Sequence, residues 1–444
     1  MSEITDRIEG IANARKTFCV VNPHCLESIV RLSEEADVIV SSDIIDESGT
    51  KLLARDVAVS RSIQAKLGHR HLQKPLEACL DVVQGASLES IASDCLGLMN
   101  KIPALALLGG SSGVEVALRG ISYMSLHGPL KLLLTLAKRF RKNNYENNLA
   151  AMIICAGLAH DGGLSDQDTD LLILSALLKD IGELYIDPKF LDVDRQLTAN
   201  EWQRVVAHPL VGQAFLKAFT HFPPALTDSV LQHHERQDGN GYPFQLSAAN
   251  MSPLGMLNGL ADCVSAIVMG NNVTGEFARD SELGSRLGER VAVALTIVPD
   301  EFPPKAIAFV TKALAPLNEV GTGSTGGSFA QRILPTLQRI RSARLLAETL
   351  SSTVMTPGLG RIGSFALSAI RDLDKRLRAT GVYDLSQLDV FETDPTLMEK
   401  TCLVLAEVNW RLRHLARKVY MRTEQGRNKQ AQVAELVSVL SMSA

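Results

Sequence analysis

Apolar residues recur at helical spacing along most of the chain, almost continuously from residue 87 onward. The helices that this spacing predicts lie within segments 87–93, 129–140, 147–160, 166–182, 197–219, 224–236 and 252–270. Residues 36–60 follow another pattern, because Val38 and Val40 occupy alternate positions and the turn-forming sequence DESG comes soon after them. The chain is therefore predicted to be mainly α-helical, with a small β-containing module near the N-terminus.

The sequence GTGSTGGS at 321–328 has the composition of a flexible linker. Helical spacing resumes after it, and five apolar residues there repeat in the 3-4-3-4 pattern of a coiled coil or bundle. These residues are Leu405, Val408, Leu412, Leu415 and Val419. Packing within one chain and a dimer interface both fit this seam, and the first is the simpler interpretation. We expect three regions: a small α/β module at 1–85, a helical domain at 86–320 and a helical region at 329–444.

The overall composition narrows the class of protein. Hydrophobic residues make up 46% of the chain and charged residues 21%, as is typical of globular proteins. The net charge of −4 gives no reason to expect nucleic-acid binding. The seven cysteines form no CxxC pair, so neither a zinc ribbon nor a disulfide framework is indicated, and the cytoplasm is the simplest location. Early acidic residues argue against a signal peptide, and the apolar runs are too short to cross a bilayer.

Histidines and aspartates gather near the ends of the predicted helices in the middle of the chain. They are Asp180, His208, His233, His234 and Asp262. Imidazoles that share a carboxylate suit Fe, Mn or Zn, so the pattern indicates a metal site, although buried structural histidines would also fit it. Lys179 stands directly before Asp180, and an ammonium group cannot bind a metal.

Four blocks of this region resemble one known family. They read LLKDIGELYIDPKFLD, LTANEWQRVVAHPLVGQAFL, QHHERQDGNGYP and LADCVSAI. Residues 147–275 are similar to the HD-GYP domain, a family of metal-dependent phosphodiesterases that hydrolyse cyclic di-GMP. The resemblance implies an HD-type helical bundle, and the N-terminal module is similar to those often fused to HD-GYP domains. It does not extend to the C-terminal region.

The resemblance implies an uneven set of metal ligands. One metal of the family would be held here by Asp180, His208, His233 and His234, and all four are present. The second would share Asp180 and use Asp262, but its two histidine positions are Asn147 and Lys179. A third metal is not expected, because the glutamate that supplies it in some members is Asn143. We therefore expect one divalent transition metal (Fe, Mn or Zn), or none if the site is fully degenerate.

Positions that contact the ligand in the family also differ. The lysine of its HDxGK motif, which faces a phosphate, is Glu183 here, and its RPYR segment corresponds to NNVT at 271–274. The loop that the family uses for contacts with the ligand or with diguanylate cyclase domains is retained. Its residues are Arg236, Asp238, Gly239, Gly241, Tyr242 and Pro243. Without the resemblance, this loop could equally be a turn whose glycines allow positive φ and whose proline fixes the exit.

These features lead us to expect a degenerate HD-GYP protein of bacterial cyclic di-GMP signalling. It would bind the nucleotide or a signalling protein such as a diguanylate cyclase, with little or no hydrolysis. A one-metal phosphodiesterase with Lys179 and Asp180 at its catalytic centre is the first alternative, and a helical scaffold is the second. A homodimer is compatible with each of these functions. We also expect Lys179 to neutralise Asp180 and Glu183 in an ion-pair cluster, provided that the helix continues far enough to place residues four apart on one face.

Overall fold

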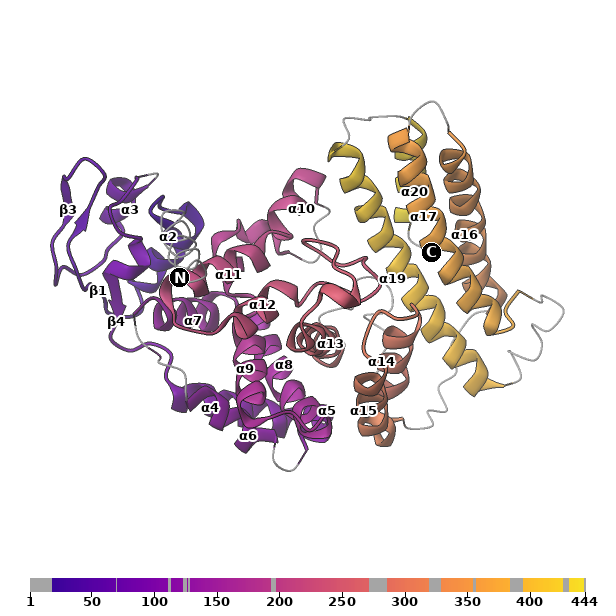
Figure 1. The fold of residues 1–444 in the computed structure, drawn as a ribbon, viewed down its shortest axis with the longest axis horizontal. Coiled ribbons are helices and arrows are strands. Elements are labelled where there is room, and N and C mark those ends of the chain that lie inside the picture. The colour runs from indigo at the N-terminus through magenta and orange to yellow at the C-terminus, as the bar shows by residue number, and fades with distance from the viewer. Residues whose placement is uncertain are drawn as a thin grey trace. The chain divides into compact units, whose positions relative to one another are not determined.

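The computed structural model is mostly helical, which confirms the predicted mainly α fold with a small β-containing module (Figure 1). It describes residues 18–68, 70–110, 113–122, 126, 128–192, 197–270, 286–318, 329–353, 357–383, 394–425 and 431–442. The linker predicted at 321–328 and the NNVT segment lie outside these ranges. Two compact units are formed, one from Met1–Gln196, Arg204–Asn272 and Phe302–Phe309, the other from Leu197–Gln203, Val273–Glu301 and Val310–Ala444. The three-region division from the sequence stays a prediction.

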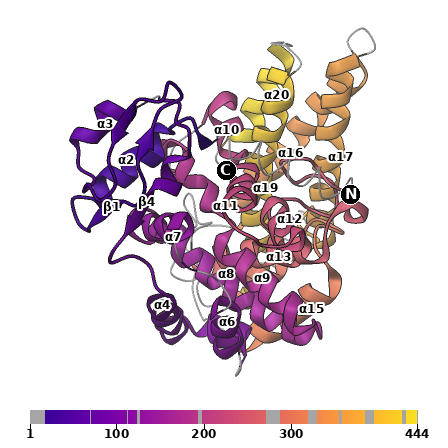
Figure 2. The ribbon, with the colours of Figure 1, turned by 60° about the vertical axis from the view of Figure 1, so that its left-hand side comes forward.

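The N-terminal module contains short antiparallel strands and two helices (Figure 2). Its elements are α2 (Pro23–Leu32), β1 (Val38–Val40), β2 (Ile44–Ile45), β3 (Lys51–Leu53), α3 (Ser62–Leu67), η1 (Leu76–Cys79) and β4 (Leu80–Val82). Strand β1 pairs with β4, and β2 forms a hairpin with β3 across the predicted DESG turn, where Gly49 has a φ of 86°. The alternation of Val38 and Val40 places both side chains in the module's core.

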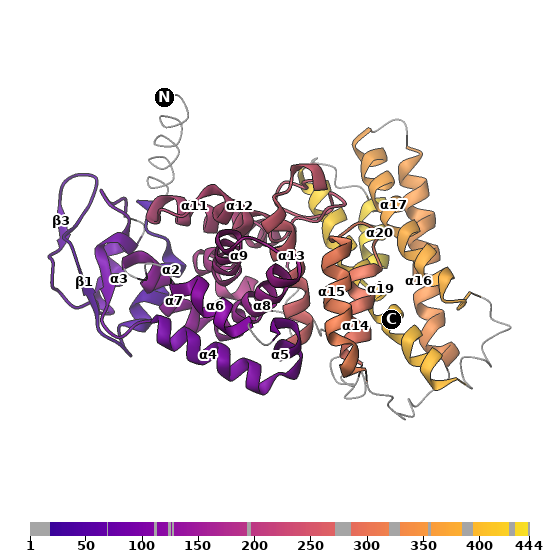
Figure 3. The same ribbon diagram turned by 60° about the horizontal axis from the view of Figure 1, so that its bottom comes forward.

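Helices α8 and α9 form the centre of the first unit (Figure 3). The helices of this unit are α4 (Leu88–Lys101), α5 (Pro103–Gly109), α6 (Gly113–Ser122), α7 (Gly128–Phe140), α8 (Lys142–Asp161), α9 (Asp166–Leu178), α11 (His208–Phe219), α12 (Pro224–Gln232) and α13 (Pro253–Val268). Almost every residue of α8 from Tyr145 to Ala159 is buried, because other helices cover it on all sides. Serine side chains cap three of these helices: Ser87 accepts a backbone hydrogen bond at the start of α4, Ser165 at the start of α9 and Ser252 at the start of α13.

Helix α9 ends at Leu178, four residues earlier than the apolar pattern predicted, and a short 3₁₀ helix η2 (Ile181–Tyr185) follows it. Gly182 explains the change. A Cβ atom on this residue would lie 2.1 Å from the carbonyl oxygen of His208, so η2 can approach the start of α11 because position 182 has no side chain. This close approach brings Asp180 next to His208.

The N-terminal module holds the other side of η2. The Nδ2 atom of Asn22 donates a hydrogen bond to the carbonyl oxygen of Tyr185 at 3.0 Å. The ring of Tyr185 packs edge-on against Phe18, with centroids 5.2 Å apart, and its hydroxyl donates to the buried carboxylate of Glu77 at 2.9 Å. The segment after Asp180 is therefore fixed from both the module and α11.

The second unit contains a four-helix bundle of α16 (Phe329–Ser351), α17 (Pro357–Ala379), α19 (Pro395–Gln425) and α20 (Ala431–Ser441). The apolar seam predicted on α19 is buried inside this bundle, together with residues of the other three helices. The seam thus packs within one chain, and it is not available as a dimer surface. The other α-helices within the described ranges are α10 (Ala199–Val205), α14 (Leu287–Thr296) and α15 (Pro304–Leu314).

Among the described helices, none is by itself long and apolar enough to cross a membrane. Helices α4 and α5 reach the required length and apolar content together, but they are bent by 113° relative to one another.

Candidate metal centre

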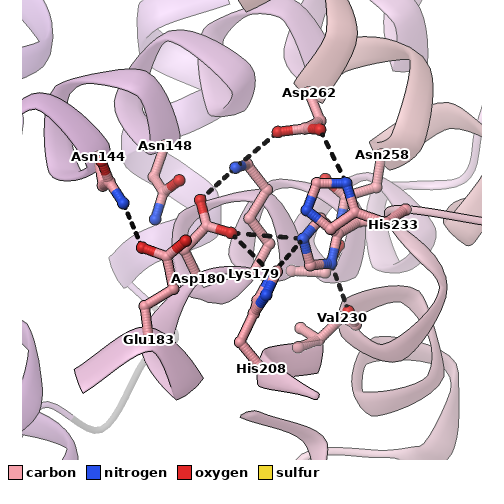
Figure 4. Close-up of polar contacts among 12 residues, drawn as sticks. Asn144, Asn148, Lys179, Asp180, Glu183, His208, Val230, His233, Asn258 and Asp262 are labelled. Carbon is pink, nitrogen blue, oxygen red and sulfur yellow. Dashed lines mark hydrogen bonds and ion pairs between the residues drawn. The ribbon is translucent and has the colours of Figure 1, made fainter. Parts of the chain in front are cut away.

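Four side chains from three segments converge in the first unit (Figure 4). Asp180 follows α9, His208 opens α11, and His233 and His234 follow α12. Each offers a potential ligand atom within 4.8 Å of those of the others. The four predicted ligands of one metal are thus brought together in space, although their role as ligands remains a prediction.

Backbone acceptors fix the orientation of two of these imidazoles. Nδ1 of His208 lies 2.8 Å from the carbonyl oxygen of Val205, and Nδ1 of His233 lies 2.6 Å from that of Val230. Because a carbonyl oxygen can only accept, each Nδ1 carries the hydrogen and each Nε2 presents a lone pair. This is how proteins commonly orient histidines that bind metals.

The two Nε2 atoms and Asp180 meet at one point. Oδ1 of Asp180 lies 3.4 Å from Nε2 of His208 and 3.3 Å from Nε2 of His233, and the two nitrogens lie 3.2 Å apart. Three electron-rich atoms at such distances repel one another unless a proton or a cation lies among them. The donor set therefore fits one divalent metal ion, for which nitrogen and carboxylate ligands suit Fe, Mn or Zn.

Lys179 lies beside this point and is almost fully buried, with 1% of its side chain exposed. Its ammonium group pairs with Asp180 on one side and with Oδ1 of Asp262, 2.8 Å away, on the other (Figure 4). Burial by itself would lower the pKa of Lys179, but the two carboxylates raise it, so the group stays charged. Although burial opposes it, the charge of Lys179 holds the pKa of Asp180 well below its ordinary value.

The comparisons with known proteins concern the middle of the chain, where this donor set lies. A model of the HD domain family matches residues 133–275. A cyclic di-GMP phosphodiesterase of Pseudomonas aeruginosa is 32% identical over 148 residues, which are 33% of this chain and 36% of that protein. Residues 133–275 are an HD domain of the HD-GYP family.

Two further matches belong to the same comparison. The 3'3'-cGAMP-specific phosphodiesterase 2 of Vibrio cholerae is 28% identical over 116 residues, 26% of this chain and 22% of that protein. The chain thus spans about a third or less of the length of these two relatives. A solved structure, the HDG"Y"P protein Bd1817 of Bdellovibrio bacteriovorus, has 16% sequence identity and a TM-score of 0.33, and the match covers 63% of this chain and 94% of that one.

The GYP loop of this HD-GYP domain lies against the histidines. The ring of Tyr242 stacks on that of His234, with centroids 4.6 Å apart and an interplanar angle of 29°. Gly239 has a φ of 76°, and a Cβ on Gly241 would lie 2.4 Å from the backbone nitrogen of Arg236, so both positions require glycine. The carboxylate of Asp238 accepts two hydrogen bonds from Asn240, each 2.9 Å long.

Two residues that follow the paired histidines make contacts within the domain that the sequence did not predict. Arg236, placed with the substrate or partner contacts, turns back and donates from Nη1 to the carbonyl oxygens of His233 and Glu235. Glu235 was not singled out at all, yet its buried carboxylate accepts from the backbone nitrogens of Phe244 at 2.6 Å and Leu246 at 2.9 Å. A carboxyl directly after the paired histidines of the motif was the available signal.

Glu183 was expected to pair with Lys179, and that expectation is wrong. Its carboxylate instead accepts a hydrogen bond from Nδ2 of Asn144 on α8, and the lysine is engaged by Asp262 (Figure 4). The physical reason is the early end of α9, since residues 179 and 183 no longer share one helix face. Burial and the negative charge of Asp180 raise the pKa of Glu183 to about 7.

A small cavity adjoins Glu183 and Asp180. Arg141, Asn144 and Asn148 line it together with apolar residues of α7, α9 and η2. Nε and Nη2 of Arg141 are buried there without a hydrogen-bond partner among the described residues, as is Oδ1 of Asn148. The cavity places one guanidinium beside the carboxylate that replaces the HDxGK lysine of the family, and the sequence pattern gave no sign of it.

The second metal implied by the resemblance does not fit these residues. Asp180 and Asp262, the two carboxylates that would bind it, both pair with the ammonium of Lys179. Asn147, at the position of the upstream histidine, offers a buried amide whose Oδ1 has no hydrogen-bond partner among the residues that the structure describes. Oδ2 of Asp262 also lies 3.4 Å from Nδ1 of His234. The described geometry therefore fits one ion per chain.

Proposed function

We propose that this chain is a degenerate HD-GYP protein that binds cyclic di-GMP or a similar cyclic dinucleotide and hydrolyses it weakly or not at all. The relatives named above, a cyclic di-GMP phosphodiesterase and a 3'3'-cGAMP-specific phosphodiesterase, support this ligand class. The observation that carries the loss of hydrolysis is the ammonium of Lys179 between Asp180 and Asp262.

The argument rests on what a pair of metals supplies. Two ions a few ångströms apart activate a bound water and stabilise both oxygens of an in-line displacement at phosphorus. In this chain Asp180, His208, His233 and His234 would hold one ion, which supplies Lewis acidity when bound. Lys179 contributes a fixed positive charge next to it, but an ammonium group cannot lower the pKa of a water as a divalent cation does. A site with one metal and the charge of Lys179 therefore keeps more of its ability to bind an anionic ligand than of its ability to hydrolyse that ligand.

The charges around the site support weak turnover as well. The partly buried carboxylate of Glu183 stands where the family has a cation that faces phosphate, and a like charge opposes an incoming phosphate. Arg141, on the other side of the same cavity, keeps some positive charge near the site. This arrangement favours a receptor, or a domain whose intact GYP loop contacts a signalling protein such as a diguanylate cyclase.

The complete set of four ligands favours one alternative, a phosphodiesterase that works with a single metal.

A binding and turnover experiment distinguishes the two functions. Purified protein should be titrated with cyclic di-GMP by calorimetry and then incubated with it in the presence of Mn²⁺ or Fe²⁺. We expect binding without conversion to linear or mononucleotide products. The matched variant His208→Ala, which removes one ligand of the cluster, controls for contaminating phosphodiesterases. Rapid turnover that this variant abolishes would establish the alternative, and absence of both binding and turnover would leave a scaffold.

A further inference from the structure

Helix α19 carries an unbalanced run of charge in the second unit. Residues 408–422 contain no aspartate or glutamate, whereas five positions are basic. These are Arg411, Arg413, Arg417, Lys418 and Arg422. Within this run, Trp410, Arg413, His414 and Arg417 follow one another at spacings of three, one and three residues, which places them on one helix face. The family match at 133–275 does not include this face.

Three aromatic rings are gathered at the face. Trp410 and His414 stack in parallel, with centroids 5.2 Å apart and an interplanar angle of 6°. Trp202 of α10, which belongs to the same unit, meets His414 edge-on at 6.5 Å. The guanidinium carbon of Arg417 lies 5.5 Å from the centroid of Trp202. All three rings are neither fully buried nor fully exposed.

The two arginines of the face lack acidic partners. Neither Arg413 nor Arg417 forms a hydrogen bond or an ion pair with any residue that the structure describes. Their neighbour Arg411 differs, because it pairs with Glu301 at 2.8 Å and with Glu407 at 2.7 Å. The unpaired state of Arg413 and Arg417 is therefore particular to this face of α19.

A third guanidinium increases the crowding of positive charge. Arg339 of α16 is buried and donates to Asn409 at 3.0 Å and to the carbonyl oxygen of Val439 at 3.1 Å. Burial and the nearby charge of Arg413 lower the pKa of Arg339 to about 10, and burial and the charge of Arg417 lower the pKa of Arg413. Like charges that are partly desolvated and have no acidic partner destabilise a fold. An anionic ligand would remove that penalty.

We propose that Arg413 and Arg417 bind the phosphate of a nucleotide whose base lies against the rings of Trp410, His414 and Trp202. Guanidinium groups bind phosphate through paired hydrogen bonds, and bases stack on aromatic side chains and on guanidinium planes. The face spans two turns of one helix, which suits one or two nucleotide units, and the net charge of −4 disfavours a long polyanion. Of the five residues of this site, Trp202 lies within the HD-GYP match at 133–275, and the four residues of α19 lie outside it.

The chain itself provides the probe, because its two tryptophans, Trp202 and Trp410, both lie at this face. Intrinsic fluorescence of the full chain should be titrated with GMP, cyclic di-GMP, inorganic phosphate and a ten-residue oligouridine, with calorimetry alongside. The test variant is Arg413→Gln with Arg417→Gln. The matched control is Arg341→Gln, at an exposed arginine of α16.

We expect GMP or cyclic di-GMP to change the fluorescence and to bind at least about tenfold more weakly to the double variant, while the control binds as the wild type does. An unchanged far-UV circular dichroism spectrum of both variants would show that the bundle is intact. If the double variant unfolds, Arg413→Lys is tested instead, because lysine keeps the positive charge but cannot form the paired hydrogen bonds of a guanidinium group. Equal affinity in wild type and variant, or no binding at millimolar nucleotide, overturns the site. If inorganic phosphate binds as tightly as GMP, the proposed stacking of a base on the rings is wrong. If the oligouridine binds more tightly than GMP and cyclic di-GMP, the ligand is a nucleic acid and not a nucleotide.

Discussion

The Nζ atom of Lys179 lies 2.8 Å from Oδ1 of Asp262, and the same ammonium group pairs with Asp180. Two carboxylates that the family resemblance assigns to a metal are thus neutralised by a side chain of the protein itself. The pairing joins the end of α9 to α13, and Asp262 lies 83 residues after Lys179 in the sequence. It gives the HD-GYP domain a permanent internal cation at this position.

Removal of this cation should destabilise the first unit. Lys179→Met leaves two buried carboxylates without a counter-charge, and breaking one partner of a buried ion pair costs about 3–5 kcal/mol. Urea denaturation followed by far-UV circular dichroism measures the loss. Lys51→Met is the matched control, because Lys51 pairs with Asp43 at the surface with 56% of its side chain exposed, and such pairs contribute about 0–1 kcal/mol. Similar losses in the two variants would show that the Lys179 cluster has no special role.

Metal-dependent hydrolysis should return only when several positions change together. The variant Asn147→His, Lys179→His and Glu183→Lys restores two ligands and one phosphate-facing cation that the family has. We expect turnover of cyclic di-GMP with Mn²⁺ or Fe²⁺ in this triple variant, measured by chromatography of the products. Lys179→His alone should stay inactive, because Asn147 and Glu183 are unchanged. Activity in that single variant would mean that Lys179 is the sole cause of the loss.

The stability of the protein should depend on pH through Glu183. Its pKa is raised from 4.5 to about 7 in the folded protein, so folding favours the protonated carboxyl. The stabilising contribution is complete below about pH 4.5 and is lost as the pH rises through about 7. Glu183→Gln cannot ionise and still accepts from Asn144, so its Tm should exceed that of the wild type at about pH 8, with a smaller difference at about pH 5. Thermal melts at both pH values measure this.

The control for that experiment is Glu35→Gln, at an exposed carboxylate of the N-terminal module. It should melt with the wild type at each pH. A Tm difference for Glu183→Gln that stays constant or reverses between about pH 5 and pH 8 would contradict burial of an ionisable Glu183.

The apolar seam on α19 should stabilise the second unit as an intramolecular core. Leu412 is fully buried in the bundle, so Leu412→Ala should lower the free energy of unfolding by about 2–5 kcal/mol. Leu345→Ala on α16, at a leucine with 66% exposure, should change it by about 0.5 kcal/mol or less. Denaturation followed by tryptophan fluorescence reports on this unit, because Trp202 and Trp410 both lie in it. A dimer that dissociates in Leu412→Ala without loss of bundle stability would contradict the intramolecular packing.

The sequence predicted those parts of the site that short motifs specify. The paired histidines, His208 and Asp180 meet as the motif implies, and the mainly α fold follows from the helical spacing. The partner of Lys179 could not be predicted in this way, because Asp262 approaches through the packing of α13 against α8 and α9. The end of α9 depends on the contact of Gly182 with α11, which is a tertiary constraint that overrides local helical preference.

The roles of Glu235 and Arg141 could not be predicted from the sequence either. The role of Glu235 depends on backbone nitrogens of residues 244 and 246, which reach it through the turns of the GYP loop. Arg141 enters the cavity beside Glu183 because α8 begins next to η2 in space, although about 40 residues separate them. In both cases the signal lies in three-dimensional neighbours, which a single sequence does not display.

The number of metal ions per chain tests the central claim most directly. Protein purified without chelator, loaded with excess Fe²⁺ or Mn²⁺ and then desalted should be analysed by inductively coupled plasma mass spectrometry. One ion per chain is predicted for the wild type, with none in His208→Ala and His233→Ala, because Lys179 occupies the position between Asp180 and Asp262. Two ions per wild-type chain, both lost when His208 is replaced, would contradict the substitution of a metal by Lys179.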